Sequence, residues 1–372
     1  MKLFQVQPQI FSFENCKDFA DFFNIGEGDF ILTNEYIYTP AMGSLKLKAD
    51  VVFQEKYGNG EPSDEMINSI LKTMKGKQYK RIIAIGGGTV IDICKILALK
   101  TTDDVVDLFD KKVPIEKDQE LIIVPTTCGT GSEVTNVSIS EIKRKHTKMG
   151  LAVDELYASY AVLIPELVKG LPFKFFVTSS IDALIHAVES YVSPKASVYT
   201  ELFSENAIKL ILNGYMQILE KGEDYRTEII NDFVIGSNYA GIAFGNAGCG
   251  AVHALSYPLG GNYHVPHGEA NYQFFTEVFK TYNRLNPDGK IKKINNILAE
   301  ILGVKDTDNI YDELSKLLDK LLIRKPLKEY GMKKEEIDLF TDNVIEGQQR
   351  LLANNYVPLS REEIRGVFQR LY

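Results

Sequence analysis

Three of the chain's five histidines lie within one glycine-rich stretch, Gly245–Asn271. His253, His264 and His267 stand there among small residues and little charge, together with six glycines. Glycine lets a backbone approach a ligand closely or turn sharply, so this composition indicates a segment shaped around a bound group. Imidazole nitrogens are common metal ligands, and the stretch is therefore the first candidate for a metal site.

A second pair of polar residues lies upstream on an otherwise apolar segment. Asp182 and His186 are four residues apart, a spacing that places both side chains on one face of a helix. Buried polar groups cost free energy unless they are paired or bind a metal, so the pair is poorly suited to a core. We expect His253, from a helix, and His267, from a following loop, to join them, with Pro258–Gly261 turning the chain between the two histidines.

Three imidazoles and one carboxylate suit Fe²⁺ or Zn²⁺ and do not distinguish these two metals. With four protein ligands a coordination position can stay open, and a divalent cation lowers the pKa of a hydroxyl group bound there. Two alternatives stay open. The Asp182 and His186 pair could be only a hydrogen bond within a helix, and His264 could replace either later ligand. His146, beside Lys145, is expected at the solvent-exposed surface.

Two loops rich in glycine and threonine each follow an apolar run that predicts a strand. Gly86–Thr89 follows Arg81–Ile85, and Thr126–Ser132 follows Leu121–Val124. Exposed backbone N–H groups beside the positive end of a helix suit a phosphate group, although a tight turn alone is the alternative. Neither loop has the Walker A sequence or the usual GxGxxG pattern. The pyrophosphate of a dinucleotide is the simplest ligand for both loops together.

The first half of the chain alternates predicted strands and helices. Further strands are expected at Phe30–Asn34, Val51–Phe53 and Tyr160–Ile164, and helices at 63–75 and 90–99. Apolar strands separated by helices predict a parallel sheet covered on both faces. After Pro165 the apolar residues recur at helical spacing, and the predicted helices are 179–193, 200–221, 224–243, 249–259, 268–283, 290–302, 309–322, 333–350 and 361–371.

These patterns predict an α/β plus all-α protein. A Rossmann-like, parallel-sheet dinucleotide-binding domain spans 1–168, and a helical metal and substrate domain spans 169–372. Two domains also fit the length of 372 residues.

The composition excludes several classes of function. The net charge of −8 and the pI near 5.4 leave no basic stripe for nucleic acid. The N-terminal sequence lacks the apolar region of a signal peptide, and no run reaches the roughly 20 apolar residues that span a bilayer. We therefore expect a cytoplasmic protein without a membrane partner. The four cysteines form no CxxC pair, which argues against a zinc–thiolate site or a disulfide framework, and Cys128 is expected to be inert.

Taken together, the motifs resemble those of the iron-containing (group III) alcohol dehydrogenase family in order and spacing across the whole chain. The matching segments are Gly86–Asp92, Thr126–Glu133, Asp182–His186 and His253–Gly268. The resemblance implies that substrate and nicotinamide meet in a cleft between two domains. It further implies an NAD-dependent interconversion of 4-hydroxybutyrate and succinate semialdehyde, a small hydroxy acid and its aldehyde.

The same resemblance assigns residues to the metal and the cofactor. It implies that the metal is held by Asp182, His186, His253 and His267. The implied pyrophosphate ligands are Gly87, Gly88 and Thr89, the residues lining the cofactor site are Thr126, Thr127 and Thr130, and a further cofactor contact is Lys148.

Two departures from the family pattern concern specificity and proton transfer. The family often has an Asp after the second strand, where a carboxylate grips the adenosine ribose and repels a 2′-phosphate. This chain has Asn34 there, which weakens the expected preference for NAD over NADP unless Glu35 compensates. Many members also have a histidine four residues after the third metal ligand. This chain has Tyr257, so the proton relay is expected to use Tyr257, His264, or the cofactor ribose and water.

Other functions remain open at this level. The chain could be another primary alcohol or diol dehydrogenase, a metal- and NAD-dependent lyase of the dehydroquinate synthase type, a nucleotide-binding sensor, or a metallohydrolase. No cation is evident for the substrate carboxylate, and polar groups such as Asn262 and Tyr263 are candidates. The family tends to form dimers, so a homodimer or a higher homo-oligomer is expected.

Overall fold

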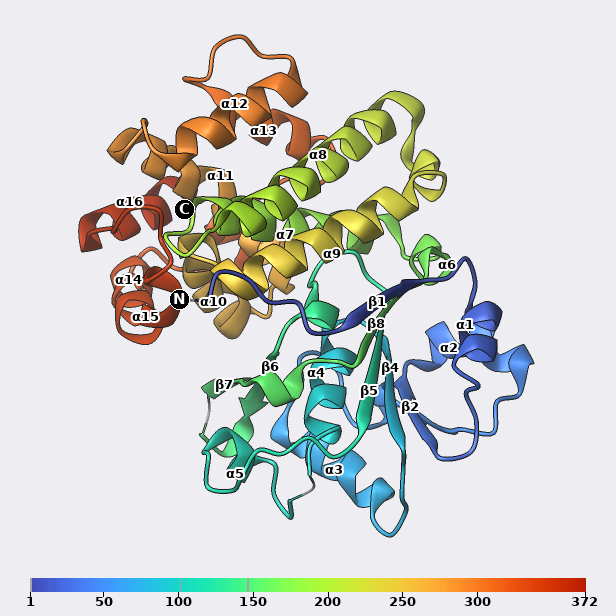
Figure 1. The fold of residues 1–372 in the computed structure, drawn as a ribbon. Helices are drawn as coiled ribbons and strands as arrows, with labels where there is room; N and C mark the ends of the chain where they lie inside the picture. The colour runs from blue at the N-terminus through green and yellow to red at the C-terminus, as the bar shows by residue number, and fades with distance from the viewer. Residues whose placement is uncertain (1, 101, 146) are drawn as a thin grey trace. The chain divides into compact units, whose positions relative to one another are not determined.

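The computed structural model describes residues 2–100, 102–145 and 147–372, so His146 and the expectation for it lie outside the described residues. The described chain divides into two compact units (Figure 1). One is Val6–Leu171, and the other combines Lys2–Gln5 with Pro172–Tyr372. The division therefore falls after residue 171, compared with the predicted 168, and Lys2–Gln5 belongs with the helical unit.

The first unit is built on a six-stranded, fully parallel sheet, as predicted. Its strands, in the spatial order β1-β8-β5-β4-β2-β3, are β1 (Gln9–Ser12), β8 (Tyr160–Leu163), β5 (Glu120–Pro125), β4 (Arg81–Gly86), β2 (Asp29–Thr33) and β3 (Asp50–Phe53). The five strands expected from apolar runs are confirmed. The edge strand β1 was not predicted, because its short sequence is mostly exposed and carries no apolar run.

Helices cover both faces of this sheet. They are α1 (Cys16–Phe22), α2 (Glu35–Met42), α3 (Asp64–Met74), α4 (Gly88–Leu97), α5 (Val106–Phe109) and α6 (Pro165–Lys169). Successive residues of a strand point to opposite faces. Accordingly Ile82 belongs to the core beneath α3 and α4, whereas Ile83 belongs to the core beneath α1 and α2. The predicted start of α3 is confirmed, since the Ser63 side chain accepts a hydrogen bond from the Met66 N–H.

The order of strands reverses between β2 and β4. The chain passes from β2 outward to β3, then returns to β4 on the other side of β2 and continues to β5. Ligands of open α/β sheets bind at the carboxyl ends of strands where the order reverses. The first glycine loop follows β4 at this point, and Asn34 follows β2. A two-stranded antiparallel hairpin, β6 (Val137–Ile142) and β7 (Thr147–Ala152), was not predicted.

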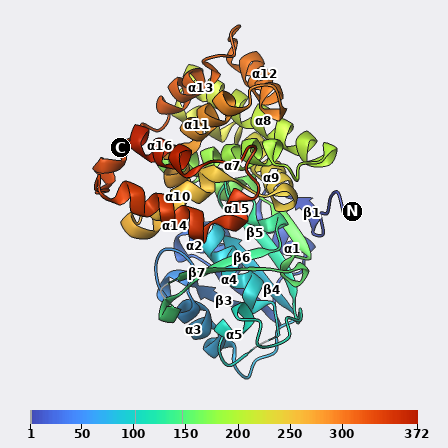
Figure 2. The same ribbon diagram turned by 90° about the vertical axis from the view of Figure 1, so that its left-hand side faces the viewer.

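The second unit is helical, as predicted (Figure 2). Its α-helices are α7 (Phe173–Val192), α8 (Val198–Lys221), α9 (Ile230–Ala247), α10 (Ala251–Tyr263), α11 (His267–Leu285), α12 (Lys290–Leu302), α13 (Ile310–Asp319), α14 (Glu336–Gly347), α15 (Gln349–Leu352) and α16 (Arg361–Leu371). Helix α7 is apolar nearly all round and is buried over most of its length, which is typical of a helix at the centre of a bundle.

One expectation about this unit is wrong. Pro258–Gly261 does not turn the chain, because α10 continues through these residues to Tyr263. A proline inside a helix removes an N–H donor and crowds the carbonyl four residues earlier, but the buried Leu255 and Leu259 hold this part of the helix against the core. The turn instead follows Tyr263, where His264 adopts a left-handed conformation with φ of 54°.

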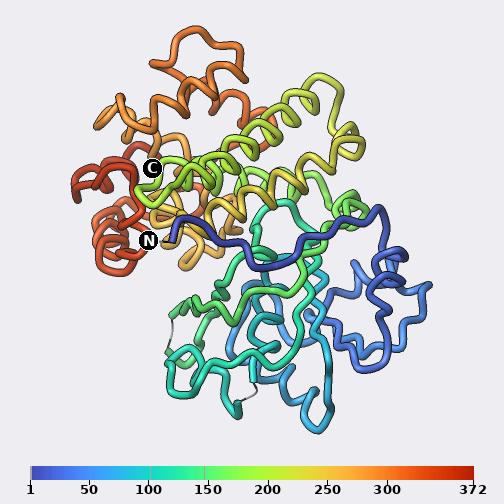
Figure 3. The backbone as a smooth tube through the Cα atoms, in the orientation of Figure 1, coloured from blue at the N-terminus to red at the C-terminus, as the bar shows by residue number. Residues whose placement is uncertain are grey.

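The N-terminal residues run alongside the helical unit (Figure 3). The Gln5 N–H donates to the Asn246 side chain on α9 at 2.7 Å, and the Phe4 ring stacks on Tyr199 and Phe203 of α8. Within the described part of the chain, no helix combines the length and the apolar character that crossing a membrane requires.

Candidate active site

Four predicted ligands meet in the helical unit. Asp182, His186, His253 and His267 each offer one ligand atom, and these atoms lie within 4.8 Å of one another. The His253 and His186 Nε2 atoms are 3.0 Å apart, and Asp182 Oδ1 is 3.9 Å from His253 Nε2 and 3.8 Å from His267 Nε2. Three imidazole nitrogens and a buried carboxylate oxygen facing a common centre are a donor set that fits a divalent metal ion.

Helix α7 provides two of the ligands through its regular spacing. Asp182 and His186 are one turn apart on the same face, and Glu189 follows on that face after a further turn. All three side chains are buried. Phe244 of α9 stacks on the His186 ring, with centroids 4.2 Å apart, and this contact limits rotation of the imidazole.

His267 is supplied by the first residue of α11 rather than by a loop. The next residue, Gly268, lets α11 approach α7 closely. A Cβ atom at Gly268 would lie 2.4 Å from the Thr178 carbonyl oxygen, so only glycine fits this crossing. The close approach brings His267 to Asp182. The His267 side chain is 43% exposed, in contrast to the other three ligands, so the site is accessible from this side.

Glu189 holds His253 in place, although sequence reasoning did not identify it. Its Oε2 is 2.5 Å from His253 Nδ1, and its Oε1 accepts the Val252 N–H at 2.8 Å. The carboxylate therefore fixes a proton on Nδ1 and leaves Nε2 as the ligand atom, the usual arrangement of a metal-bound histidine. The buried thiol of Cys249 also neighbours Glu189 and His253. The sequence feature that could have revealed Glu189 is its position as an acidic residue on the same face of an apolar helix as Asp182 and His186.

Asn271 supports the other side of the site and was also missed. Its amide Nδ2 lies 2.7 Å from Asp182 Oδ1 and 3.1 Å from His267 Nε2. Ser256 of α10 donates to its carbonyl oxygen. Asn271 thus links three helices and orients the carboxylate toward the imidazoles. Its position one turn after His267 on α11 is the signal that could have revealed it.

Electrostatics of the site favour an ionised carboxylate. Burial acts to raise the pKa of Asp182, but the charges of His186, His267 and His253 and the Asn271 hydrogen bond outweigh it, so this pKa is lowered. Burial acts to lower the pKa of His253, but Cys249 and Glu189 raise it well above its ordinary value.

The first unit brings the two glycine loops together. A Cβ atom at Gly88 would lie 3.2 Å from Thr130 Cγ2, and one at Gly87 would lie 3.6 Å from Thr127 Cγ2. Thr126 is buried, and its N–H donates to the Gly86 carbonyl at 3.1 Å. The contact at Gly88 is tight and favours glycine, whereas the one at Gly87 is an ordinary van der Waals distance. The start of α4 thus lies beside the second loop, the arrangement that suits a pyrophosphate.

Three predicted cofactor residues have partners inside the protein. Thr89 Oγ1 donates to the Gly60 carbonyl at 3.0 Å, and Lys148 Nζ forms an ion pair with Glu61 Oε2 at 2.5 Å. Both residues thus contact the same short segment. Asn34 is buried at the end of β2, where its amide donates to Glu55 Oε2 at 2.9 Å.

Two residues that sequence reasoning missed, the half-buried Asp92 and the buried Lys95, fix the second loop. Asp92 accepts hydrogen bonds from the Ser132 hydroxyl at 2.8 Å and the Ile139 N–H at 2.9 Å. Lys95 Nζ donates to the Ser132 and Thr135 hydroxyls and the Val137 carbonyl. Burial lowers the pKa of Lys95 to about 8, while Asp92 and Glu133 oppose this change. These contacts tie the loop to α4 and hold its backbone in place.

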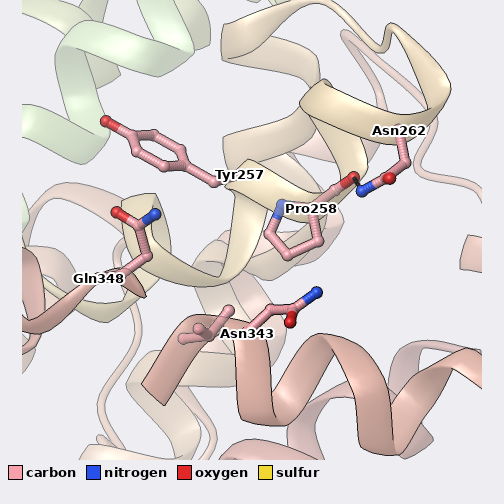
Figure 4. Close-up of a pocket in the computed structure, with 6 residues that line it drawn as sticks. Tyr257, Pro258, Asn262, Asn343 and Gln348 are labelled. Atoms are coloured by element: carbon pink, nitrogen blue, oxygen red, sulfur yellow. Dashed lines mark hydrogen bonds between the residues drawn. The ribbon is translucent and has the colours of Figure 1, made fainter. Parts of the chain in front are cut away.

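The proposed proton-relay residues differ in their surroundings. Tyr257 follows His253 by one turn of α10 and lines a cavity of about 190 Å³ (Figure 4). His264 is exposed and does not join the metal-ligand group of the described residues. Its proton-transfer role remains a prediction.

The cavity is open on one side and lies between α10, α14 and the residue that follows α14. Its lining residues are Tyr257, Pro258, Asn262, Asn343, Val344 and Gln348. Figure 4 shows the Asn343 and Gln348 side chains across the cavity from Pro258 and Tyr257. Tyr263, a predicted carboxylate partner, instead donates from its hydroxyl to Glu336.

Comparison with known proteins decides the family. Residues 16–165 match the family described as iron-containing alcohol dehydrogenase, and residues 176–372 match the C-terminal part of the same family. The chain belongs to the iron-containing alcohol dehydrogenase family. It is 68% identical to the 4-hydroxybutyrate dehydrogenase of Clostridium kluyveri over 372 residues, which cover 100% of both chains.

A more distant sequence relative and a solved structure also match over most of the chain. Long-chain-alcohol dehydrogenase 1 of Geobacillus thermodenitrificans is 32% identical over 84% of this chain and 80% of its own. The crystal structure of sulfoacetaldehyde reductase from Bifidobacterium kashiwanohense in complex with NAD⁺ superposes with a TM-score of 0.86. That structure is 22% identical and covers 99% of this chain and 98% of the reductase, so it supports the fold alone.

Proposed function

We propose that this protein is a metal-dependent alcohol dehydrogenase that interconverts 4-hydroxybutyrate and succinate semialdehyde with NAD(H). The substrate assignment rests on the 68% identity with the Clostridium kluyveri enzyme over the full length of both chains. The four-ligand group on α7, α10 and α11 supports the metal dependence. The two glycine loops support a dinucleotide, and they would have no role in a metallohydrolase.

The metal would be held by Asp182, His186, His253 and His267. A divalent cation there supplies Lewis acidity, which lowers the pKa of a substrate hydroxyl and polarises a carbonyl. The family name favours Fe²⁺, and the donor set also suits Zn²⁺. Glu189 keeps the Nδ1 proton of His253, and Asn271 keeps Asp182 oriented, so the ligands are positioned before substrate arrives.

The α/β unit would hold the cofactor. We propose that Gly87, Gly88 and Thr89 bind the pyrophosphate, that Thr126, Thr127 and Thr130 line the site, and that Lys148 contacts the cofactor. Asp92 and Lys95 act through the second loop by fixing its backbone. Tyr257 is the favoured proton-relay residue because it lies one turn from His253. We also propose that the protein is cytoplasmic and forms a homodimer or a higher homo-oligomer.

A substrate panel tests this function. Holoenzyme of measured metal content is assayed with 4-hydroxybutyrate, ethanol, 1,2-propanediol, butanol and glycerol, each with NAD⁺ and NADP⁺. We expect the highest kcat/KM with 4-hydroxybutyrate and NAD⁺, with one NADH formed per substrate oxidised. Turnover without net NADH would favour a lyase. A higher kcat/KM for another alcohol would move the protein to a different branch of the family.

We further propose that the cavity beside Tyr257 receives the substrate carboxylate. The Cα atoms of His253 and Tyr257 are about 6 Å apart along α10. The hydroxyl oxygen and the carboxyl carbon of 4-hydroxybutyrate are separated by four bonds that span roughly 5 Å. The side-chain amides of Asn262, Asn343 and Gln348 offer N–H donors, and none of the six lining residues carries a charge that would repel an acid.

Charge changes at Gln348 test this subsite. Gln348→Glu should lower the ratio of kcat/KM for 4-hydroxybutyrate to kcat/KM for 1-butanol by roughly tenfold or more, because two carboxylates would face each other. Gln348→Lys should raise that ratio. The matched control Gln349→Glu adds the same charge one residue later, outside the lining, and should leave the ratio within about twofold. Equal ratios in all three variants would place the carboxylate elsewhere.

A further inference from the structure

A carboxylate lies at the carboxyl end of β2, but it comes from a residue distant in the sequence, Glu55. Asn34 occupies the position where dinucleotide-binding domains commonly carry an acid, and Glu35 next to it is exposed. Glu55, which follows β3, reaches this position from the neighbouring strand. Its Oε2 accepts the Asn34 amide at 2.9 Å, and its Oε1 accepts the Glu35 N–H at 2.7 Å. Glu55, 21 residues after Asn34, thus places a carboxylate where Asn34 itself has none.

We propose that Glu55 binds the adenosine ribose hydroxyls of the cofactor and excludes NADP(H) in favour of NAD(H). This inference rests on the proposed use of a nicotinamide dinucleotide. It extends that proposal by naming the residue that binds the ribose hydroxyls. The site lies where the strand order reverses, between β2 and β4, and the glycine loop for the pyrophosphate follows β4. Ribose and pyrophosphate of one dinucleotide fit these neighbouring strand ends.

The geometry leaves Glu55 able to accept further hydrogen bonds. A carboxylate has about four lone-pair sites, and the contacts with Asn34, the Glu35 N–H and the Glu55 N–H occupy three of them. Burial acts to raise the pKa of Glu55, but hydrogen bonds from the Glu35 N–H and Asn34 and the charge of Lys56 outweigh it and lower this pKa. Glu55 is therefore ionised at neutral pH and would repel the 2′-phosphate of NADP(H).

A simpler role for Glu55 would be to cap helix α2. The Asn34 side chain makes no capping bond, and Glu55 accepts the Glu35 N–H at the start of α2 instead. A capping role predicts lower stability when Glu55 is changed, without any change in cofactor preference. A ribose-binding role predicts a change in cofactor preference. The two roles are therefore separable by measuring both quantities in the same variants.

Binding of NADH and NADPH to the holoenzyme, followed by nicotinamide fluorescence, tests the proposal without substrate. Glu55→Gln should raise the ratio of NADPH affinity to NADH affinity by about ten- to a hundredfold, because one repulsive charge near the phosphate is removed. The matched variant Glu35→Gln removes the same charge from the adjacent residue and should shift that ratio by less than about twofold. Asn34→Asp combined with Glu55→Gln should restore the preference for NADH.

Three outcomes would overturn the role of Glu55. The first is an unchanged affinity ratio in Glu55→Gln, whatever the melting temperature of that variant. The second is a larger change of the ratio in Glu35→Gln than in Glu55→Gln. The third is a wild-type enzyme that binds NADPH more tightly than NADH. Failure of the proposed use of a nicotinamide dinucleotide has a different signature, since wild-type protein would then bind neither NADH nor NADPH, and failure of the proposed substrate is detected separately by the substrate panel.

Discussion

Replacing His253 with alanine is expected to abolish stoichiometric metal binding and to lower kcat/KM for 4-hydroxybutyrate by about a thousandfold or more. His253 Nε2 faces His186 Nε2 at 3.0 Å and Asp182 Oδ1 at 3.9 Å, so its loss removes one of four donors. Lewis acidity contributes several kcal/mol to catalysis of this kind, and about 1.4 kcal/mol corresponds to a tenfold change in rate. Metal content by elemental analysis and steady-state kinetics measure the two effects.

The matched variant for this experiment is His264→Ala. It removes an imidazole from the same glycine-rich stretch, and His264 is outside the ligand group of the described residues. We expect it to retain one metal ion per chain. Circular dichroism should show that both variants keep the helical fold. If His253→Ala retains its metal while His264→Ala loses it, the ligand assignment is wrong.

Substituting Glu189 with glutamine is expected to weaken metal binding by about ten- to a hundredfold, the usual effect of changing the hydrogen-bond partner of a ligating histidine. The amide is nearly the same size as the carboxylate, but it lacks the charge that holds the Nδ1 proton of His253. Competition with a chelator gives the metal affinity. We expect the activity of Glu189→Gln to depend on added metal at concentrations that saturate the wild-type enzyme.

A control separates this positioning role from loss of stability. Glu205→Gln removes an acid from the surface of α8, where Glu205 pairs with Lys209, and should not change metal affinity. If Glu189→Gln unfolds at lower temperature but binds metal as tightly as wild type, Glu189 supports the fold and not the metal centre.

The grouping of the four predicted ligands could be anticipated because local spacing indicates it. Asp182 and His186 are one helical turn apart, and His253 and His267 stand out in a glycine-rich sequence. The parallel sheet was predictable for a similar reason, since buried strands such as β4 and β5 are continuous apolar runs.

The supporting residues could not be predicted from local spacing, because they act across long sequence separations. Glu189 contacts His253 from 64 residues away, and Glu55 reaches Asn34 from the neighbouring strand. Nothing in the sequence near Glu55 specifies that β3 lies beside β2. The prediction of a turn at Pro258 was wrong for another reason. Proline and glycine favour turns locally, but packing of the surrounding helix residues determined the outcome.

The most direct test of the metal centre is anomalous diffraction from crystals of the holoenzyme at the iron and zinc absorption edges. The structure predicts one peak among an Asp182 carboxylate oxygen and imidazole nitrogens of His186, His253 and His267. A strong peak elsewhere, or a catalytically active crystal with no peak at this position, would contradict the account.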